Sequence, residues 1–192
     1  MDYISDSEIK DIVQRVLQQS GQTLTKPASS TPVSQPLPTN QKTVAIGSDH
    51  GGFEMKTALI DALKELKYEV MDCGTTSKEA VDYPDFALAV AEQVCSGKAW
   101  RGIMIDGAGI GSCMVANKVP GIRAAMAYDY ASASNSREHN DANYLTLGAG
   151  LIGLNQAKLI VKTWLSTNFG GGRHQSRIDK IMAVEKRFMK ES

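Results

Sequence analysis

The chain has 192 residues, 42% of them hydrophobic, which is enough for one compact domain with an appendage. Lysine and arginine balance aspartate and glutamate at 21 each, which argues against a general binder of nucleic acid or anionic membranes, because such proteins carry a basic excess. Three cysteines without paired spacing argue against a disulfide framework or a zinc site, and no apolar run reaches the roughly 18 residues of a membrane span, so we expect a cytoplasmic protein.

Residues 1–19 predict a short amphipathic helix. Ser5 and Glu8 have the spacing of a capping box, in which each side chain accepts from the other residue's backbone N–H. Apolar residues then recur at helical spacing, and these are Ile9, Ile12, Val13, Val16 and Leu17. Residues 20–41 hold four of the six prolines among Ser, Thr and Gln, which is typical of a flexible linker. A helix on such a linker needs a partner, either a groove on another protein or the chain's own domain.

Residues 42–192 predict one α/β domain. Five short β-rich runs alternate with helical segments, and the runs are Thr43–Gly47, Glu69–Cys73, Gly102–Asp106, Arg123–Ala127 and Tyr144–Leu147. The helical stretch after the first run carries an apolar stripe of Leu59, Leu63 and Leu66. Such alternation predicts right-handed βαβ crossovers and a mostly parallel, doubly wound sheet. Ligands of such sheets bind at the carboxyl ends of the strands.

Two loops after predicted strands carry groups suited to ligand binding. Asp49 and His50 follow the first strand in the segment GSDHGGF, where glycines let a ligand approach closely, although an aspartate there is as often a helix N-cap. After the third strand, Asp106 precedes glycines at alternate positions in DGAGIGS, which free backbone N–H groups to cradle an anion. The loop lacks the GK[ST] ending of a P-loop, and its place on the third strand is poor for a dinucleotide fold.

Two later segments are also polar. The run NSREHNDAN follows the fourth strand, and GGGRHQSR precedes the last helix. Arg173 and Arg177 stand four residues apart, so on one helix face they could grip a phosphate, or they could be a solvated basic helix start. All three histidines, His50, His139 and His174, lie in Gly- or Asn-flanked segments outside the apolar stripes. That placement favours a functional site over three core histidines.

Five ordered segments resemble the ribose-5-phosphate isomerase B family, which also contains the galactose-6-phosphate isomerase subunits. They are GSDHGGF, DYPDFA, DGAGIGSCMVANKVPGIRAA, REHNDANYLTLG and GGRHQSR, and together they span about the last 150 residues. The resemblance implies a Rossmann-like three-layer α/β/α sandwich with a five-stranded sheet. It also implies a homodimer, or a homotetramer built from dimers, with sites at the subunit interface and with neither metal nor cofactor.

The same resemblance implies a role for each matching residue in interconverting an aldose phosphate and its ketose through an enediolate. Asp49 and His50 contact the sugar, Tyr83 lines the pocket, and His139 assists ring opening. The groups implied for the enediolate oxygens are Asn140 and the N–H groups of Gly107, Ala108, Gly109 and Gly111. The groups implied for the phosphate are Arg173, His174 and Arg177. Preorganised N–H groups fit this role because they stabilise negative charge on oxygen by about 3 kcal/mol.

Two departures from the family's pattern bear on the chemistry. Many members carry a proton-abstracting cysteine where this chain has Asp106, and others a glutamate where it has Ser112. Asp106 is therefore the predicted base, because its carboxylate is ionised at neutral pH. It also resembles the galactose-6-phosphate isomerase subunit that relies on a companion subunit for the cysteine. Gly150 stands where ribose-phosphate isomerases often carry a phosphate-binding arginine, which favours a substrate of different length or pose.

Three interpretations therefore stay open. The first is an aldose–ketose isomerase with ribose 5-phosphate and ribulose 5-phosphate as the default pair. The second is a galactose-6-phosphate-type subunit that needs a companion, and the third is a sugar-phosphate-binding protein without turnover. The N-terminal helix and linker resemble the encapsulation peptides of bacterial microcompartment enzymes. That resemblance implies a shell protein as the partner of residues 1–19 and the microcompartment lumen as the location.

Overall fold

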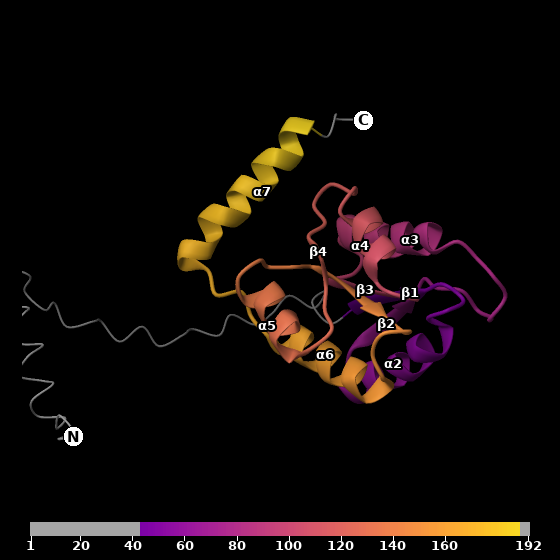
Figure 1. Ribbon diagram of the computed structural model, residues 1–192. Helices are drawn as coiled ribbons and strands as arrows, with labels where there is room; N and C mark the ends of the chain where they lie inside the picture. Colours follow the sequence, from indigo (N-terminus) through magenta and orange to yellow (C-terminus); the bar gives the residue numbers. More distant parts are fainter. Residues whose placement is uncertain (1–42, 189–192) are drawn as a thin grey trace, which may run out of the picture. The chain divides into compact units, whose positions relative to one another are not determined.

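The computed structural model describes residues 43–188, which form a three-layer α/β/α sandwich (Figure 1). Its strands are β1 (Thr43–Ser48), β2 (Glu69–Asp72), β3 (Arg101–Asp106), β4 (Ala124–Met126) and β5 (Tyr144–Gly148). They make one sheet in the order β2-β1-β3-β5-β4, with every pairing parallel. The predicted fold class is confirmed. The predicted N-terminal helix and linker lie outside the described residues.

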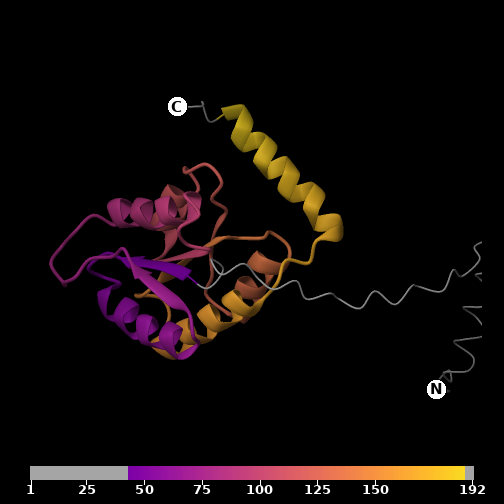
Figure 2. The same cartoon turned by 180° about the vertical axis from the view of Figure 1, so that it is seen from behind.

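Helices cover both faces of the sheet (Figure 2). One face packs against α2 (Phe53–Glu65), α5 (Tyr130–Glu138) and α6 (Leu154–Ser166), and the other packs against α3 (Tyr83–Cys95) and α4 (Ile110–Ala116). A 3-10 turn, η2 (Gly172–His174), leads into α7 (Gln175–Phe188), which lies beside the segment before β4, where the N–H of Gly121 donates to Glu185 at 2.9 Å (Figure 1). Within residues 43–188, no helix combines the length and the apolar character that crossing a membrane requires.

The two cores follow from the alternation of side chains along each strand. Ile46 enters the core beneath α2, α5 and α6, whereas Ala45 enters the core beneath α3 and α4. Leu59 and Leu63 are fully buried, as the stripe on α2 predicts. Leu66 is 40% exposed, so the prediction for it is wrong, because it is the C-cap residue where the chain leaves α2 toward β2.

The direction of the helices decides which edge of the sheet each loop reaches. All strands run the same way, so α5 starts at the carboxyl edge after β4 and ends at the amino edge where β5 begins. In the same way α6 returns the chain to the amino edge after β5. The loops after β1 and β3 therefore lie at the carboxyl edge, and the segments after α5 and α6 lie at the amino edge. The five residues of β5 separate these edges by about 16 Å.

Candidate functional site

The loop after β1 places an acid and an imidazole at the carboxyl edge, as predicted. Asp49 is only 7% exposed, and its Oδ1 accepts from the N–H of Gly52 at 3.0 Å. Its Oδ2 has no hydrogen-bond partner among residues 43–188. His50 is exposed, and its Nδ1 lies 3.2 Å from both the carbonyl oxygen and the N–H of Val81. Asp49 therefore keeps one carboxylate oxygen available to a ligand.

The glycine-rich loop after β3 is organised around Asp106, which is 4% exposed. Its Oδ1 accepts from the N–H groups of Ala108, at 2.8 Å, and of Gly109. Its Oδ2 accepts from the N–H of Ser112 at 3.2 Å and from the Ser112 hydroxyl. Both carboxylate oxygens are thus occupied inside the loop, and two of the N–H groups predicted to bind a ligand bind Asp106 instead. The N–H of Gly107 has no partner within the described part of the chain.

The two loops face each other across Gly51. A Cβ built on Gly51 would lie 3.4 Å from Oδ1 of Asp49 and 3.8 Å from the N of Gly107. The carboxylate of Asp49 and the unpartnered N–H of Gly107 therefore border the same space. A hollow of about 370 Å³ adjoins it, lined by Gly51, Glu54, Met55, Ala149, Ile152, Gly153 and Leu154.

Tyr83 packs against the helix that follows the glycine-rich loop, and its role in lining a pocket stays a prediction. It is the first residue of α3, and its phenol lies directly over Gly111 in α4. A Cβ on Gly111 would approach the Tyr83 hydroxyl to 2.5 Å, which no real Cβ does. Glycine at this position is therefore what allows Tyr83 to close over the loop.

A second group of predicted site residues lies at the amino edge. His139 is the C-cap residue of α5 and His174 ends η2, and their rings stack with centroids 4.3 Å apart and planes inclined by 7°. The N–H of Gly170 donates to the carbonyl of Glu138 at 2.8 Å and holds the two segments together. Asn140 follows His139 directly. The structure thus joins two of the three histidines and leaves His50 at the other edge.

Positive charge gathers around His174. The pKa of His174 lies below its usual value, first because the imidazole loses contact with water, then because of His139, Arg173 and Arg177, while Glu138 opposes the shift. Arg173 directly precedes His174 in η2, and Arg177 lies in the first turn of α7. Such a cluster of donors suits an anionic ligand such as a phosphate.

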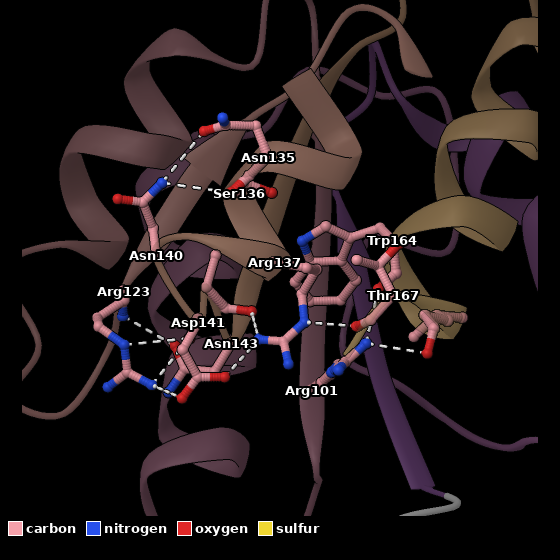
Figure 3. A network of polar contacts seen from close by, with 12 residues as sticks. Arg101, Arg123, Asn135, Ser136, Arg137, Asn140, Asp141, Asn143, Trp164 and Thr167 are labelled. Carbon is pink, nitrogen blue, oxygen red and sulfur yellow. Dashed lines mark hydrogen bonds and ion pairs between the residues drawn. The ribbon is translucent and has the colours of Figure 1, made fainter. Parts of the chain in front are cut away.

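Three buried or partly buried arginines, Arg101, Arg123 and Arg137, bond to other groups of the fold near the amino edge (Figure 3). Asp141 accepts from Arg137 through Oδ1 and from Arg123 through Oδ2, both at 2.8 Å. Arg101 donates to the carbonyl of Trp164 at 2.7 Å, and burial, followed by the charge of Arg137, lowers its pKa to about 9. These contacts all lie within the fold, so the three arginines anchor the loop rather than offer themselves to a ligand.

The predicted site residues therefore form two groups at opposite edges of the sheet. The carboxyl-edge group consists of Asp49, His50, Tyr83, Asp106, Gly107, Ala108, Gly109 and Gly111. The amino-edge group consists of His139, Asn140, Arg173, His174 and Arg177. The expectation that ligand loops lie at the carboxyl ends of strands holds for the first group and is wrong for the second, because α5 and α6 carry the chain back across the sheet. About 16 Å of β5 keeps the groups apart within one chain.

The fold and the carboxyl-edge loops define a Rossmann-like α/β protein with a glycine-rich loop after its third strand, β3. Residues 44–181 match the family model described as Ribose/Galactose Isomerase. The chain belongs to this family, and the predicted resemblance is confirmed.

Named relatives agree with this assignment. The chain is 45% identical to ribose-5-phosphate isomerase B of Escherichia coli over 146 residues, which cover 76% of this chain and 98% of the relative. The solved ribose-5-phosphate isomerase B of Clostridium thermocellum is 53% identical, with a TM-score of 0.76 over 77% of this chain and 99% of that one. The Mycoplasma genitalium isomerase, solved with bound ribulose 5-phosphate, is 40% identical, with a TM-score of 0.72 over 75% and 96%.

Proposed function

We propose that this protein interconverts ribose 5-phosphate and ribulose 5-phosphate through an enediolate intermediate. The observation that carries the proposal is the carboxyl-edge group, in which a buried carboxylate with one free oxygen and an unpartnered backbone N–H lie beside Gly51. It occurs in a chain that covers nearly all of relatives named ribose-5-phosphate isomerase B. A proton acceptor beside an N–H donor is the arrangement that enediolate formation requires.

We further propose that one working site joins the carboxyl-edge group of one copy to the amino-edge group of another. The separation of about 16 Å along β5 exceeds the length of a five-carbon sugar phosphate, so a single copy cannot apply both groups to one substrate. A homodimer, or a homotetramer of such dimers, satisfies this requirement. A companion isomerase subunit is the alternative, and purified chain without turnover would favour it.

The proton transfer needs a base, and the two candidates differ in their contacts. Asp106 is the base predicted by its position, yet four hydrogen bonds from its own loop occupy both of its oxygens. Asp49 is nearly as buried and keeps Oδ2 free. We therefore propose that Asp49 moves the proton between C2 and C1, and that Asp106 holds the loop in shape. The N–H of Gly107 then stabilises the enediolate oxygen.

The amino-edge group supplies the remaining functions in this proposal. His139 assists opening of the cyclic sugar, and Asn140 binds an enediolate oxygen. Arg173 and Arg177 bind the phosphate through their positive charges, and the ring of His174 between them in the sequence adds a hydrogen bond.

Activity of the purified full-length chain on five- and six-carbon aldose phosphates tests the function, and two variants test the base. Asp49→Asn is expected to lower kcat by about 1,000-fold without changing the unfolding temperature. Asp106→Asn is expected to lower the unfolding temperature by about 5 °C and to keep more activity than Asp49→Asn. Loss of turnover in an Asp106→Asn variant of unchanged stability would show that Asp106, and not Asp49, is the base. Binding without turnover on every substrate would reject the isomerase.

For the N-terminus we propose a targeting helix at residues 1–19 and a linker at residues 20–41, ahead of an isomerase domain at residues 42–192. The support is the sequence pattern of cap, apolar stripe and proline-rich linker. The expected partner is a microcompartment shell protein. Residues 1–41 fused to a fluorescent protein should co-localise with co-expressed shell, and Val13→Asp should abolish this; diffuse fluorescence of the unmodified fusion would refute the proposal.

A further inference from the structure

Asn135 is a polar residue of the amino edge to which the sequence assigned no role. It lies on α5 one helical turn before His139, so the two side chains are neighbours on one face. Its Nδ2 lies 2.8 Å from Nδ1 of His139. On its other side, Oδ1 accepts from Nδ2 of Asn140 at 3.3 Å (Figure 3). Asn135 thus bridges two members of the amino-edge group.

The orientation of both amides follows from one backbone carbonyl. The backbone oxygen of Asn135 can only accept, and Asn140 approaches it to 3.4 Å, so the NH2 group of Asn140 must face this way. The same NH2 group meets the Asn135 side chain, which must therefore present its oxygen to Asn140. The NH2 group of Asn135 is then left facing His139. Assigned by these contacts, Nδ1 of His139 is an acceptor without a proton.

We infer that Asn135 is a positioning residue that holds His139 as the neutral tautomer with its proton on Nε2. In this form the imidazole offers the substrate a hydrogen-bond donor and no acceptor. The role rests on the proposed isomerase function, in which such a donor would polarise the ring oxygen or an enediolate oxygen. Neutral imidazole can act in this way without giving up its proton.

The surroundings of His139 fix the orientation of its ring and leave Nε2 accessible. Stacking against His174 at 4.3 Å restricts rotation that would exchange the two nitrogens. Glu138 Oε1 lies 4.0 Å from Nε2, so an acceptor stands on the side to which this tautomer presents its proton. Nε2 makes no hydrogen bond within residues 43–188, and the side chain is 38% exposed. The donor is therefore open to a ligand.

The tautomer can be read directly by nitrogen-15 NMR of the full chain with labelled histidine, since only three histidines occur. We expect Nε2–H for His139 in the unmodified protein and a mixture of both tautomers in Asn135→Ala. Asn135→Asp should reverse the preference, because a carboxylate can only accept and therefore requires Nδ1–H. Ala131→Asp is the matched control, since it adds the same charge on α5 two helical turns from His139.

Activity supplies the second readout. Asn135→Asp should lower kcat/KM for ribose 5-phosphate about 10-fold to 100-fold and move the acid limb of the pH profile to higher pH, while Ala131→Asp should behave as the unmodified chain. An Nδ1–H signal in the unmodified protein, or an unchanged tautomer in Asn135→Ala, would overturn the inference. So would an Asn135→Asp profile equal to that of Ala131→Asp. The NMR spectra are recorded without substrate, so they test the tautomer of His139 even if the protein does not isomerise ribose 5-phosphate.

Discussion

Lys56 on α2 is a charged residue whose side chain is buried in the fold. Its side chain is 2% exposed, and its ammonium group donates to both Asp72 carboxylate oxygens at 2.7 and 2.8 Å and to the carbonyl of Thr75 at 2.9 Å. All three donors of the ammonium group are thereby satisfied. The contacts pin the loop after β2 against the end of β1, where the N–H of Thr75 donates to Ser48, the residue before Asp49.

Lys56→Met should therefore destabilise the protein by about 3 kcal/mol, the low end for a broken buried pair, because Asp72 is 42% exposed. Thermal unfolding should show a midpoint about 8 °C lower. Lys78→Met is the matched control, since the pair of Lys78 with Glu54 is exposed and should contribute no more than about 1 kcal/mol. Equal midpoints for the two variants would contradict this account.

At this scale the sequence identifies residue types better than their contacts. Asp49 and Asp106 are both recognisable beside glycines at strand ends. Which carboxylate is free depends on the turn of the loop before α4, which directs two N–H groups and Ser112 onto Asp106. Asn135 was missed, although its spacing of four residues from His139 on a helix was a usable signal.

Helices and strands were largely predictable because their signals are local. The predicted strands match the observed ones to within a residue at either end, and β4 is shorter than Arg123–Ala127 because Arg123 is committed to Asp141 and Asn143 outside the sheet. The position of the histidine-containing segments was not predicted. It follows from the direction of α5 and α6, which run antiparallel to the strands. They carry the segments of His139 and His174 to the amino edge, whereas His50 stays at the carboxyl edge.

The stability of the protein should depend on pH through His174, which lies where η2 meets the end of α5. The pKa of His174 is lowered in the folded state, so the unfolded chain takes up a proton more readily. The contribution of this group to stability is therefore complete above the ordinary histidine pKa of about 6.5 and is lost as the pH falls through the lower folded value. His174→Gln should flatten the fall of the unfolding temperature below about pH 6.5. A variant curve parallel to that of the unmodified protein would rule this out.

At the scale of the whole molecule, the two groups of predicted site residues lie at opposite edges of the sheet within one chain. One face of α7 is apolar and exposed, with Ile181, Val184 and Phe188 at 46%, 60% and 72% exposure, and it lines a hollow together with Ile122. Such a surface favours contact with another copy. In the proposed dimer, the second copy brings its amino-edge group to the carboxyl-edge group of the first. Assembly and activity are then expected to be inseparable.

Mixing two inactive variants tests this coupling. Asp49→Asn and His139→Ala should each be inactive alone, yet a hybrid dimer would hold one intact site made from the unmodified group of each chain. Random pairing makes half of the dimers hybrid, so co-refolded variants should recover roughly a quarter of the unmodified activity. His139→Ala mixed with Arg173→Ala should recover none, because every site would lack one amino-edge residue. No recovery in the first mixture, despite measured hybrid formation, would show that each site lies within one chain.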